Sequence, residues 1–121
     1  MYEIKAQVEF SAAHHLLDYE GKCEHQHGHN WIVEAFVRGT MLDQSNILVD
    51  FKALKKDLKL ILDEMDHQDL NELPAFKNES PSSEFIANYI YTRLKEKYVE
   101  LFKISVWETR ESCASFIEDH D

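Results

Sequence analysis

Two stretches near the start of the chain alternate with the period of a β-strand. In residues 2–10 the apolar side chains occupy every second position, and Glu, Lys or Gln fills the positions between them. In residues 31–38 every second residue from Trp31 to Val37 is again apolar, until Gly39 and Thr40 interrupt the pattern. Because a period of two places successive side chains on opposite faces, each stretch is predicted to be a strand with one buried face. We expect the two strands to pair.

The middle of the chain changes to the spacing of amphipathic helices. Asp50 can cap a first helix, whose apolar stripe comprises Phe51, Leu54, Leu58, Ile61, Leu62 and Met65. Ser80 and Pro81 predict the start of a second helix, because Ser caps well and Pro is tolerated in the first turn. The stripe of this second helix comprises Phe85 or Ile86, Tyr89, Ile90, Leu94 and Tyr98.

Residues 102–108 and 113–118 are predicted to form two more strands, joined by the polar turn 109–112. The order ββααββ favours an α+β fold, with a four-stranded antiparallel sheet and both helices on one face. The other face is expected to carry Ile32, Phe36, Ile104 and Val106. One chain offers no third layer to cover that face, so assembly with further copies is predicted.

Length, charge and cysteine content narrow the class of protein. The 121 residues suit one domain spanning 1–121, and no apolar run approaches the roughly 18 to 20 residues of a membrane span. The start of the chain lacks a signal-peptide core and the two cysteines do not make a disulfide framework, so a soluble cytoplasmic protein is expected. A net charge of −10 disfavours a nucleic-acid partner, since phosphate contacts require clustered Lys and Arg.

Histidines and one cysteine gather between the first two predicted strands. His27 and His29 project to the same side of an extended backbone, and His14 or His15 from the neighbouring strand can supply a third imidazole. Three imidazoles suit Zn²⁺ and leave one position open for substrate, as in a catalytic site. If Cys23 also binds, the zinc is closed and structural. A third interpretation is that these histidines are merely solvated.

Two acidic positions elsewhere carry candidate chemistry. Asp66 precedes His67 at the predicted end of the first helix, where a carboxylate can hold an imidazole in one tautomer and raise its basicity. The alternative is an ordinary histidine favoured by the helix dipole. Glu108 closes an apolar strand, and its carboxylate could accept paired hydrogen bonds from an amidine-like edge or simply be exposed.

Six short motifs follow one another along nearly the whole chain. They are Phe10-Ser11-Ala12-Ala13-His14, Cys23-x3-His27-Gly28-His29-Asn30, Leu48-Val49-Asp50-Phe51-x2-Leu54-Lys55, Met65-Asp66-His67-x2-Leu70-Asn71, Pro81-Ser82-Ser83-Glu84 and Val106-x-Glu108-Thr109. In this order they resemble the 6-pyruvoyl-tetrahydropterin synthase family, including its bacterial branch, the 6-carboxy-tetrahydropterin synthases of queuosine biosynthesis.

The resemblance implies the tunnelling fold (T-fold), in which subunits join their sheets into a barrel and the sites lie between subunits. It implies a homo-oligomer, a hexamer of two trimers, that acts as a lyase with Zn²⁺ as cofactor. The residues that match the family's functional positions are His14, His27 and His29 as zinc ligands, Cys23 as catalytic thiol, Asp66 and His67 as proton relay, and Glu108 with Thr109 at the pterin ring.

The implied substrate is 7,8-dihydroneopterin triphosphate, and the shortness of the chain favours 6-carboxy-5,6,7,8-tetrahydropterin as the product. In this interpretation zinc acidifies the protons that must leave, Cys23 abstracts a carbon-bound proton, and His67 exchanges the complementary proton while Asp66 orients it.

Three alternatives to this product and role stay open. The resemblance also covers the 6-pyruvoyl product. Glu24, directly after Cys23, matches a glutamate that in a folate-pathway branch cleaves the side chain to 6-hydroxymethyl-dihydropterin, unless it is a solvated loop acid. A non-enzymatic alternative is a zinc-stabilised binding module in which Cys23 is the fourth ligand and Asp66 and His67 only end a helix.

Overall fold

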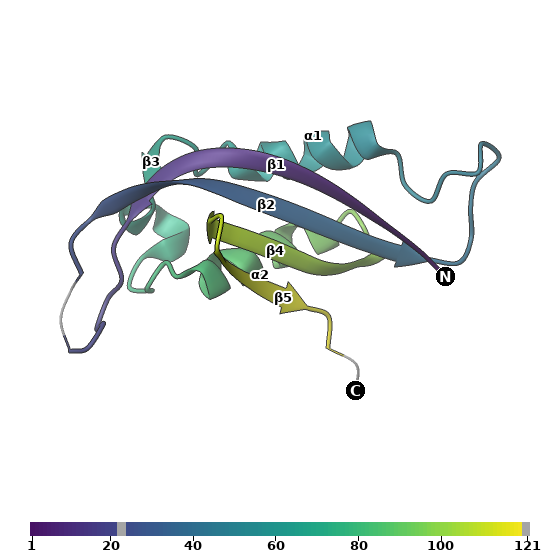
Figure 1. Cartoon of the computed structure of the whole chain (residues 1–121). Helices are drawn as coiled ribbons and strands as arrows, with labels where there is room; N and C mark the ends of the chain where they lie inside the picture. The colour runs from purple at the N-terminus through teal and green to yellow at the C-terminus, as the bar shows by residue number, and fades with distance from the viewer. Residues whose placement is uncertain (22–23, 120–121) are drawn as a thin grey trace.

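The computed structural model describes residues 1–21 and 24–119, so Cys23 lies outside the described residues. The chain begins with a long hairpin of β1 (Tyr2–His14) and β2 (His27–Gly39), followed by α1 (Phe51–Leu62) and a short strand β3 (Gln68–Asp69). Two 3₁₀ turns (Leu70–Glu72 and Pro74–Phe76) lead to α2 (Ser83–Lys95), and β4 (Leu101–Thr109) and β5 (Ser112–Ile117) end the fold (Figure 1).

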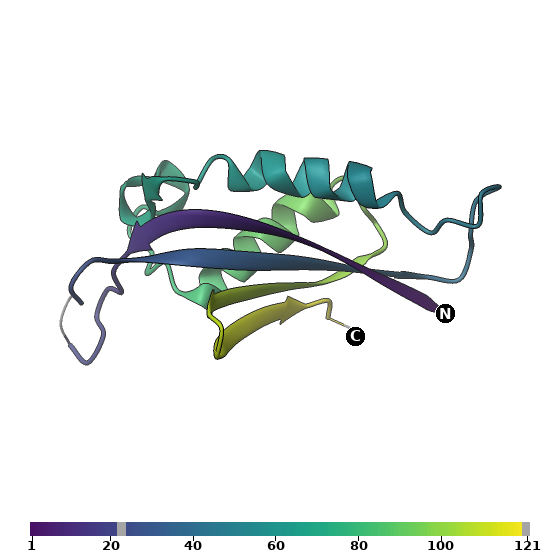
Figure 2. The same ribbon diagram turned by 45° about the horizontal axis from the view of Figure 1, so that its top comes forward.

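The strands form one sheet in the order β3-β1-β2-β4-β5. The hairpin is in register from Tyr2 opposite Gly39 to His14 opposite His27, and the pairs β2/β4 and β4/β5 are also antiparallel. Both helices lie on the same side of this sheet (Figure 2). The predicted α+β arrangement is confirmed. β3 is an addition that pairs parallel with β1, and its two residues are too short to show a period in the sequence.

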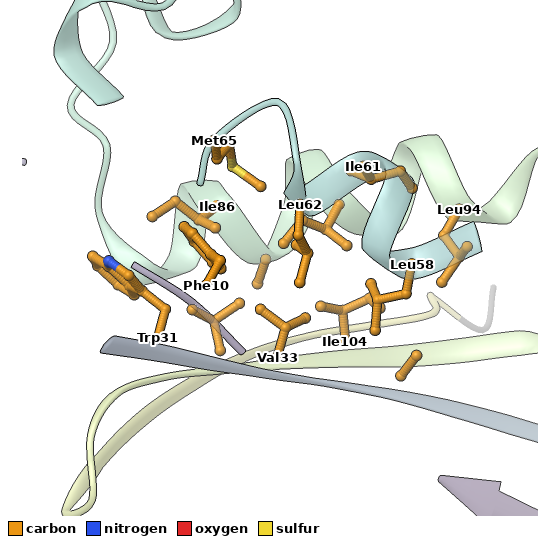
Figure 3. Packing of buried hydrophobic residues seen from close by; sticks show 14 of the residues in the cluster. Phe10, Trp31, Val33, Leu58, Ile61, Leu62, Met65, Ile86, Leu94 and Ile104 are labelled. Carbon is orange, nitrogen blue, oxygen red and sulfur yellow. The ribbon is translucent and has the colours of Figure 1, made fainter. Parts of the chain in front are cut away.

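The core fills the space between the sheet and the two helices (Figure 3). The predicted inner residues of β2 are fully buried there, together with several stripe residues of both helices: Trp31, Val33, Ala35, Val37, Leu54, Leu58, Ile86, Ile90 and Leu94. Of the predicted stripes, Phe51 is instead exposed, and Tyr89 and Tyr98 are only partly buried. Asp50 caps α1 by accepting the Lys52 N–H at 3.0 Å. Ser82, and not Ser80, caps α2, because its hydroxyl accepts the Phe85 N–H at 3.1 Å. Within the described residues, neither helix is long and apolar enough to cross a membrane.

One predicted face assignment is wrong. Ile104 and Val106 are fully buried beneath the helices, because they pair with Ala35 and Val33 of β2. The alternation of Lys103 and Ser105 with Ile104 and Val106 indicates this side, although apolar Phe102 and Trp107 obscure the pattern.

Aromatic side chains of β2 and β4 occupy the side of the sheet away from the helices, which we call the open face. There the ring of Phe36 contacts Phe102 with centroids 6.2 Å apart, and the indole of Trp107 donates to Glu34 at 2.6 Å. The open face is therefore apolar in part, as expected, but β4 contributes a different set of residues to it.

Candidate metal centre and active site

The hairpin brings three imidazoles together at one end of the sheet. His14 pairs directly with His27, and His29 lies two residues along on the same face of β2. The ring centroids are 4.6 Å apart for His14 and His27, 4.7 Å for His27 and His29, and 5.4 Å for His14 and His29. His15 instead lies beside Asn71. The structure therefore selects His14 as the third member of the cluster.

Hydrogen bonds on the far side of two rings turn their Nε2 atoms into the cluster. The Nδ1 atom of His14 lies 2.8 Å from the carbonyl oxygen of Pro81, and that of His27 lies 3.0 Å from the carbonyl oxygen of His25. Carbonyl oxygens only accept, so Nδ1 is the donor in both rings, and Nε2 is the nitrogen that faces the cluster. This is the orientation that a metal ligand requires.

His29 contributes the third nitrogen. Its Nε2 atom is buried and has no hydrogen-bond partner among the described residues, although the Glu108 carboxylate lies close to it. Burial is the main cause that lowers the pKa of His29, and the adjacent imidazoles of His27 and His14 lower it further, against the opposing effect of Glu108. The lowered pKa favours the neutral form of the His29 ring, whose buried Nε2 atom faces the Glu108 carboxylate.

Glu108, at the end of β4, reaches the same cluster. Its Oε1 atom lies 2.8 Å from Nε2 of His29, 3.5 Å from Nε2 of His14 and 3.7 Å from Nε2 of His27. Its Oε2 atom accepts a hydrogen bond from the Ser83 hydroxyl at 3.2 Å. Our sequence interpretation did not place Glu108 beside the histidines. The sequence does indicate this position, because Glu108 lies two residues after Val106. Side chains two residues apart on a strand point to the same face, which here is the helix side of β4.

These four residues fit a divalent metal ion. Their potential ligand atoms all lie within 4.8 Å of one another. Zinc bound tetrahedrally at ~2.0–2.1 Å holds two nitrogens ~3.3 Å apart, and the Nε2 atoms of His14 and His27 are 3.1 Å apart. Two lone pairs at that distance repel each other unless a cation lies between them. Three imidazole nitrogens with one carboxylate oxygen are a donor set typical of zinc.

The predicted pair Asp66 and His67 is formed beside β1. Asp66 Oδ1 accepts the Ser11 N–H at 2.9 Å and lies 3.0 Å from His67 Nδ1. The His67 N–H donates to the Ser11 carbonyl at 2.5 Å, and its backbone is in the left-handed region with φ 60°. The hydrogen bond from Ser11 holds the pKa of Asp66 below its ordinary value, and His67 lowers it further. A charged Asp66 thus orients Nδ1 of an imidazole whose ring is 81% exposed.

A hollow of about 530 Å³ is lined by one residue of the cluster, His29, and by one residue of the pair, His67. The rest of its lining is formed by Ser11, Ala12, Ala13, Gly28, Asn30, Gln68 and Asp69. A molecule in this hollow can contact a candidate metal ligand and the relay imidazole together.

Two further predicted site residues lie at different distances from the cluster. Glu24 is partly buried: its Oε1 atom accepts the Leu16 N–H at 3.3 Å and lies 3.7 Å from His27 Nδ1, so it is at the edge of the cluster. Thr109 is exposed and lines a separate hollow on the open face with Glu34 and Trp107. Within one chain the structure does not bring Thr109 to the histidines.

The fold and the site together define a T-fold protein with a cluster of three histidines and Glu108 that could hold a metal ion. Residues 3–119 match the family model described as 6-pyruvoyl tetrahydropterin synthase. The chain therefore belongs to the 6-pyruvoyl tetrahydropterin synthase family. The predicted family, T-fold and enzyme class, a lyase of the tetrahydropterin synthase type, are confirmed.

Individual relatives carry two product names. The 6-carboxy-5,6,7,8-tetrahydropterin synthase of Synechocystis is 35% identical over 122 residues, which cover 96% of this chain and 93% of the relative. A putative 6-pyruvoyl tetrahydrobiopterin synthase of Caenorhabditis elegans is 32% identical and covers 88% of each chain. Among solved structures, the C. elegans 6-pyruvoyl tetrahydropterin synthase has a TM-score of 0.87 at 28% identity, covering 98% of this chain and 96% of that one.

Proposed function

We propose that this chain converts 7,8-dihydroneopterin triphosphate to 6-carboxy-5,6,7,8-tetrahydropterin, in queuosine biosynthesis, at a zinc centre of His14, His27 and His29. The observation that carries the proposal is the convergence of their nitrogens, together with a hollow that both His29 and His67 line. The likeness to the Synechocystis 6-carboxy-5,6,7,8-tetrahydropterin synthase supports this product over the 6-pyruvoyl one.

The roles of the side chains follow from their chemistry. Zinc, when bound, supplies a Lewis acid that lowers the pKa of substrate hydroxyls and stabilises negative charge on oxygen. Cys23 is the base that removes a carbon-bound proton, and His67 exchanges the complementary proton through the nitrogen that Asp66 leaves free. The Asp66 carboxylate lies 3.0 Å from His67 Nδ1, which supports a role for Asp66 in orienting the His67 ring. Glu108 accepts the amino and ring N–H groups of the pterin.

We also propose that the protein works as a homo-oligomer, a hexamer of two trimers, with sites between subunits. The open face supports an assembly, since it carries Ile32, Phe36, Phe102 and Trp107 on neighbouring strands. In the assembly, Thr109 would meet substrate at a site that a neighbouring copy completes. Light scattering coupled to size-exclusion chromatography tests the predicted mass.

A second candidate activity is favoured by the place of Glu24. Its carboxylate lies 3.7 Å from His27 Nδ1, close enough to the metal centre to act on a bound substrate. A carboxylate there can serve as the base for cleavage of the side chain to 6-hydroxymethyl-dihydropterin, the folate-type reaction.

The deciding experiment is a product assay by mass spectrometry with parallel measurement of zinc content. Wild type is expected to release the 6-carboxy product, and Cys23→Ala to keep its zinc and its fold while losing turnover. A Cys23→Ala variant that loses zinc and unfolds would support the zinc-stabilised binding module instead. Loss of a hydroxymethyl product alone in Glu24→Ala, with the exposed Glu79→Ala variant as control, would establish the second activity.

A further inference from the structure

Asn71 makes an unusual contact with the strand that carries His14. Its side-chain Oδ1 accepts the N–H of His15 at 2.9 Å, and its Nδ2 donates to the carbonyl of the same residue at 3.0 Å. Both backbone groups of His15 are therefore satisfied by one amide. A side chain that offers a donor and an acceptor in one plane can replace a neighbouring strand at this point.

The register of the sheet explains why an asparagine stands there. Parallel pairing of β1 with β3 places Ala12 opposite Gln68 and Ala13 opposite Asp69. Two steps further along the same register, His15 lies opposite Asn71. The backbone has by then turned into the 3₁₀ segment Leu70–Glu72, so the Asn71 side chain makes the bonds that the backbone no longer can.

We propose that Asn71 is a positioning residue for the metal centre, because its amide fixes the end of β1 on which His14 lies. The segment before Asn71 is already bonded to β1 at Ser11 through Asp66 and His67. Asn71 adds a second attachment on the other side of His14. His14 thus lies between two points at which residues 66–71 are bonded to the β1 segment, one at Ser11 and one at His15. These bonds fix the position of His14 relative to that segment.

This inference rests on the proposed zinc centre, and zinc affinity tests it independently of turnover. Zn²⁺ affinity is measured by competition with a chromophoric chelator for wild type and for Asn71→Ala. Changes in residues that orient a metal ligand typically cost 10- to 100-fold in affinity, so Asn71→Ala is expected to bind zinc about tenfold more weakly. Asn71→Asp is expected to weaken binding as well, since its carboxylate cannot donate to the His15 carbonyl and repels it.

Three control variants separate positioning from general stability. Asn88→Ala removes an exposed asparagine. Among the described hydrogen bonds, the Asn88 side chain makes one, in which it accepts from the Thr92 hydroxyl at 3.3 Å. Leu94→Ala destabilises the core at the end opposite Trp31 (Figure 3). His15→Ala removes the imidazole, whose Nε2 atom lies 3.4 Å from the Asn71 Nδ2 atom, and keeps the two backbone bonds. All three are expected to retain wild-type zinc affinity.

The outcomes are distinct. Unchanged affinity in Asn71→Ala overturns the inference, as does a loss no larger than that of Leu94→Ala, which would make the effect one of stability. A loss in His15→Ala equal to that in Asn71→Ala also overturns it, because the ring and not the backbone would then be the relevant group. A wild-type protein without zinc affinity would refute the proposed metal centre, and this inference with it.

Discussion

Replacing Glu108 by Gln separates two roles for the carboxylate that lies among the histidines. Glu108 Oε1 is within 3.7 Å of all three Nε2 atoms, so its position suits a fourth metal ligand as well as the proposed acceptor for the pterin ring. Gln has nearly the same shape and keeps an oxygen that can accept from Ser83. The substitution removes one charge and turns one acceptor into a donor.

The expected magnitude follows from the hydrogen bonds that the carboxylate would make. A pterin ring offers two donors along one edge, and each hydrogen bond to a charged acceptor contributes about 1.5 to 3 kcal/mol. Gln keeps one acceptor oxygen, so the change removes one of these bonds at a cost of about 1.5 to 3 kcal/mol, and each 1.4 kcal/mol is a factor of ten. We therefore expect kcat/KM of Glu108→Gln to fall by about 10- to 10²-fold. The three imidazoles remain, so zinc content should be retained.

The assay measures kcat/KM with dihydroneopterin triphosphate and the zinc stoichiometry of the same preparation. Glu111→Gln is the matched control, because Glu111 is exposed in the turn after β4. If Glu108→Gln loses zinc as completely as His27→Ala does, Glu108 is a metal ligand and the proposed contact with the pterin ring is wrong. A variant with full zinc and unchanged kcat/KM would refute both roles.

Three more changes test the relay and the fold. Asp66→Asn still accepts from Ser11 but no longer favours a charged His67, so single-turnover kinetics should show a rate about 10²-fold lower with the fold retained by circular dichroism. Tyr98 donates to Asp57 at 2.5 Å and thereby lowers the pKa of Asp57. The resulting contribution to the free energy of unfolding is present above pH ~4 and is lost as the pH falls through the pKa of Asp57 in the folded protein. Tyr98→Phe should therefore lower the free energy of unfolding by about 1 kcal/mol at pH 7 and by less at pH 3, as urea titrations will show. Leu58→Ala removes a fully buried side chain of α1 and should cost about 3 kcal/mol by the same measurement, and a cost below 1 kcal/mol would contradict the described core.

The hairpin and the histidine cluster could be predicted because local patterns determine them. A period of two in both strands defines which side chains share a face, and the spacing of His27 and His29 follows directly from it. The choice between His14 and His15 could not be made from spacing, because it depends on the register of β1 against β2. Pairing of His14 with His27 decides it.

Other features depend on contacts that are distant in sequence. The faces of β4 were assigned wrongly because apolar Phe102 and Trp107 obscure the alternation of Lys103 and Ser105 with Ile104 and Val106. The pairing of β4 with Val33 and Ala35 shows which side is buried. β3 has two residues and therefore no period to detect. The attachment of Asn71 to His15 joins groups 56 residues apart, and no sequence pattern of either segment indicates it.

The two tryptophans lie in very different places. The buried ring of Trp31 meets the rings of His14 and His29 nearly edge-on, at centroid distances of 4.8 and 5.3 Å. Trp107 lies on the open face beside Glu34. The protein thus carries two intrinsic fluorophores, one beside the histidines of the proposed metal centre and one on the open face of the sheet. Single-tryptophan variants would let metal loading and subunit association be followed separately, in real time and without an added label.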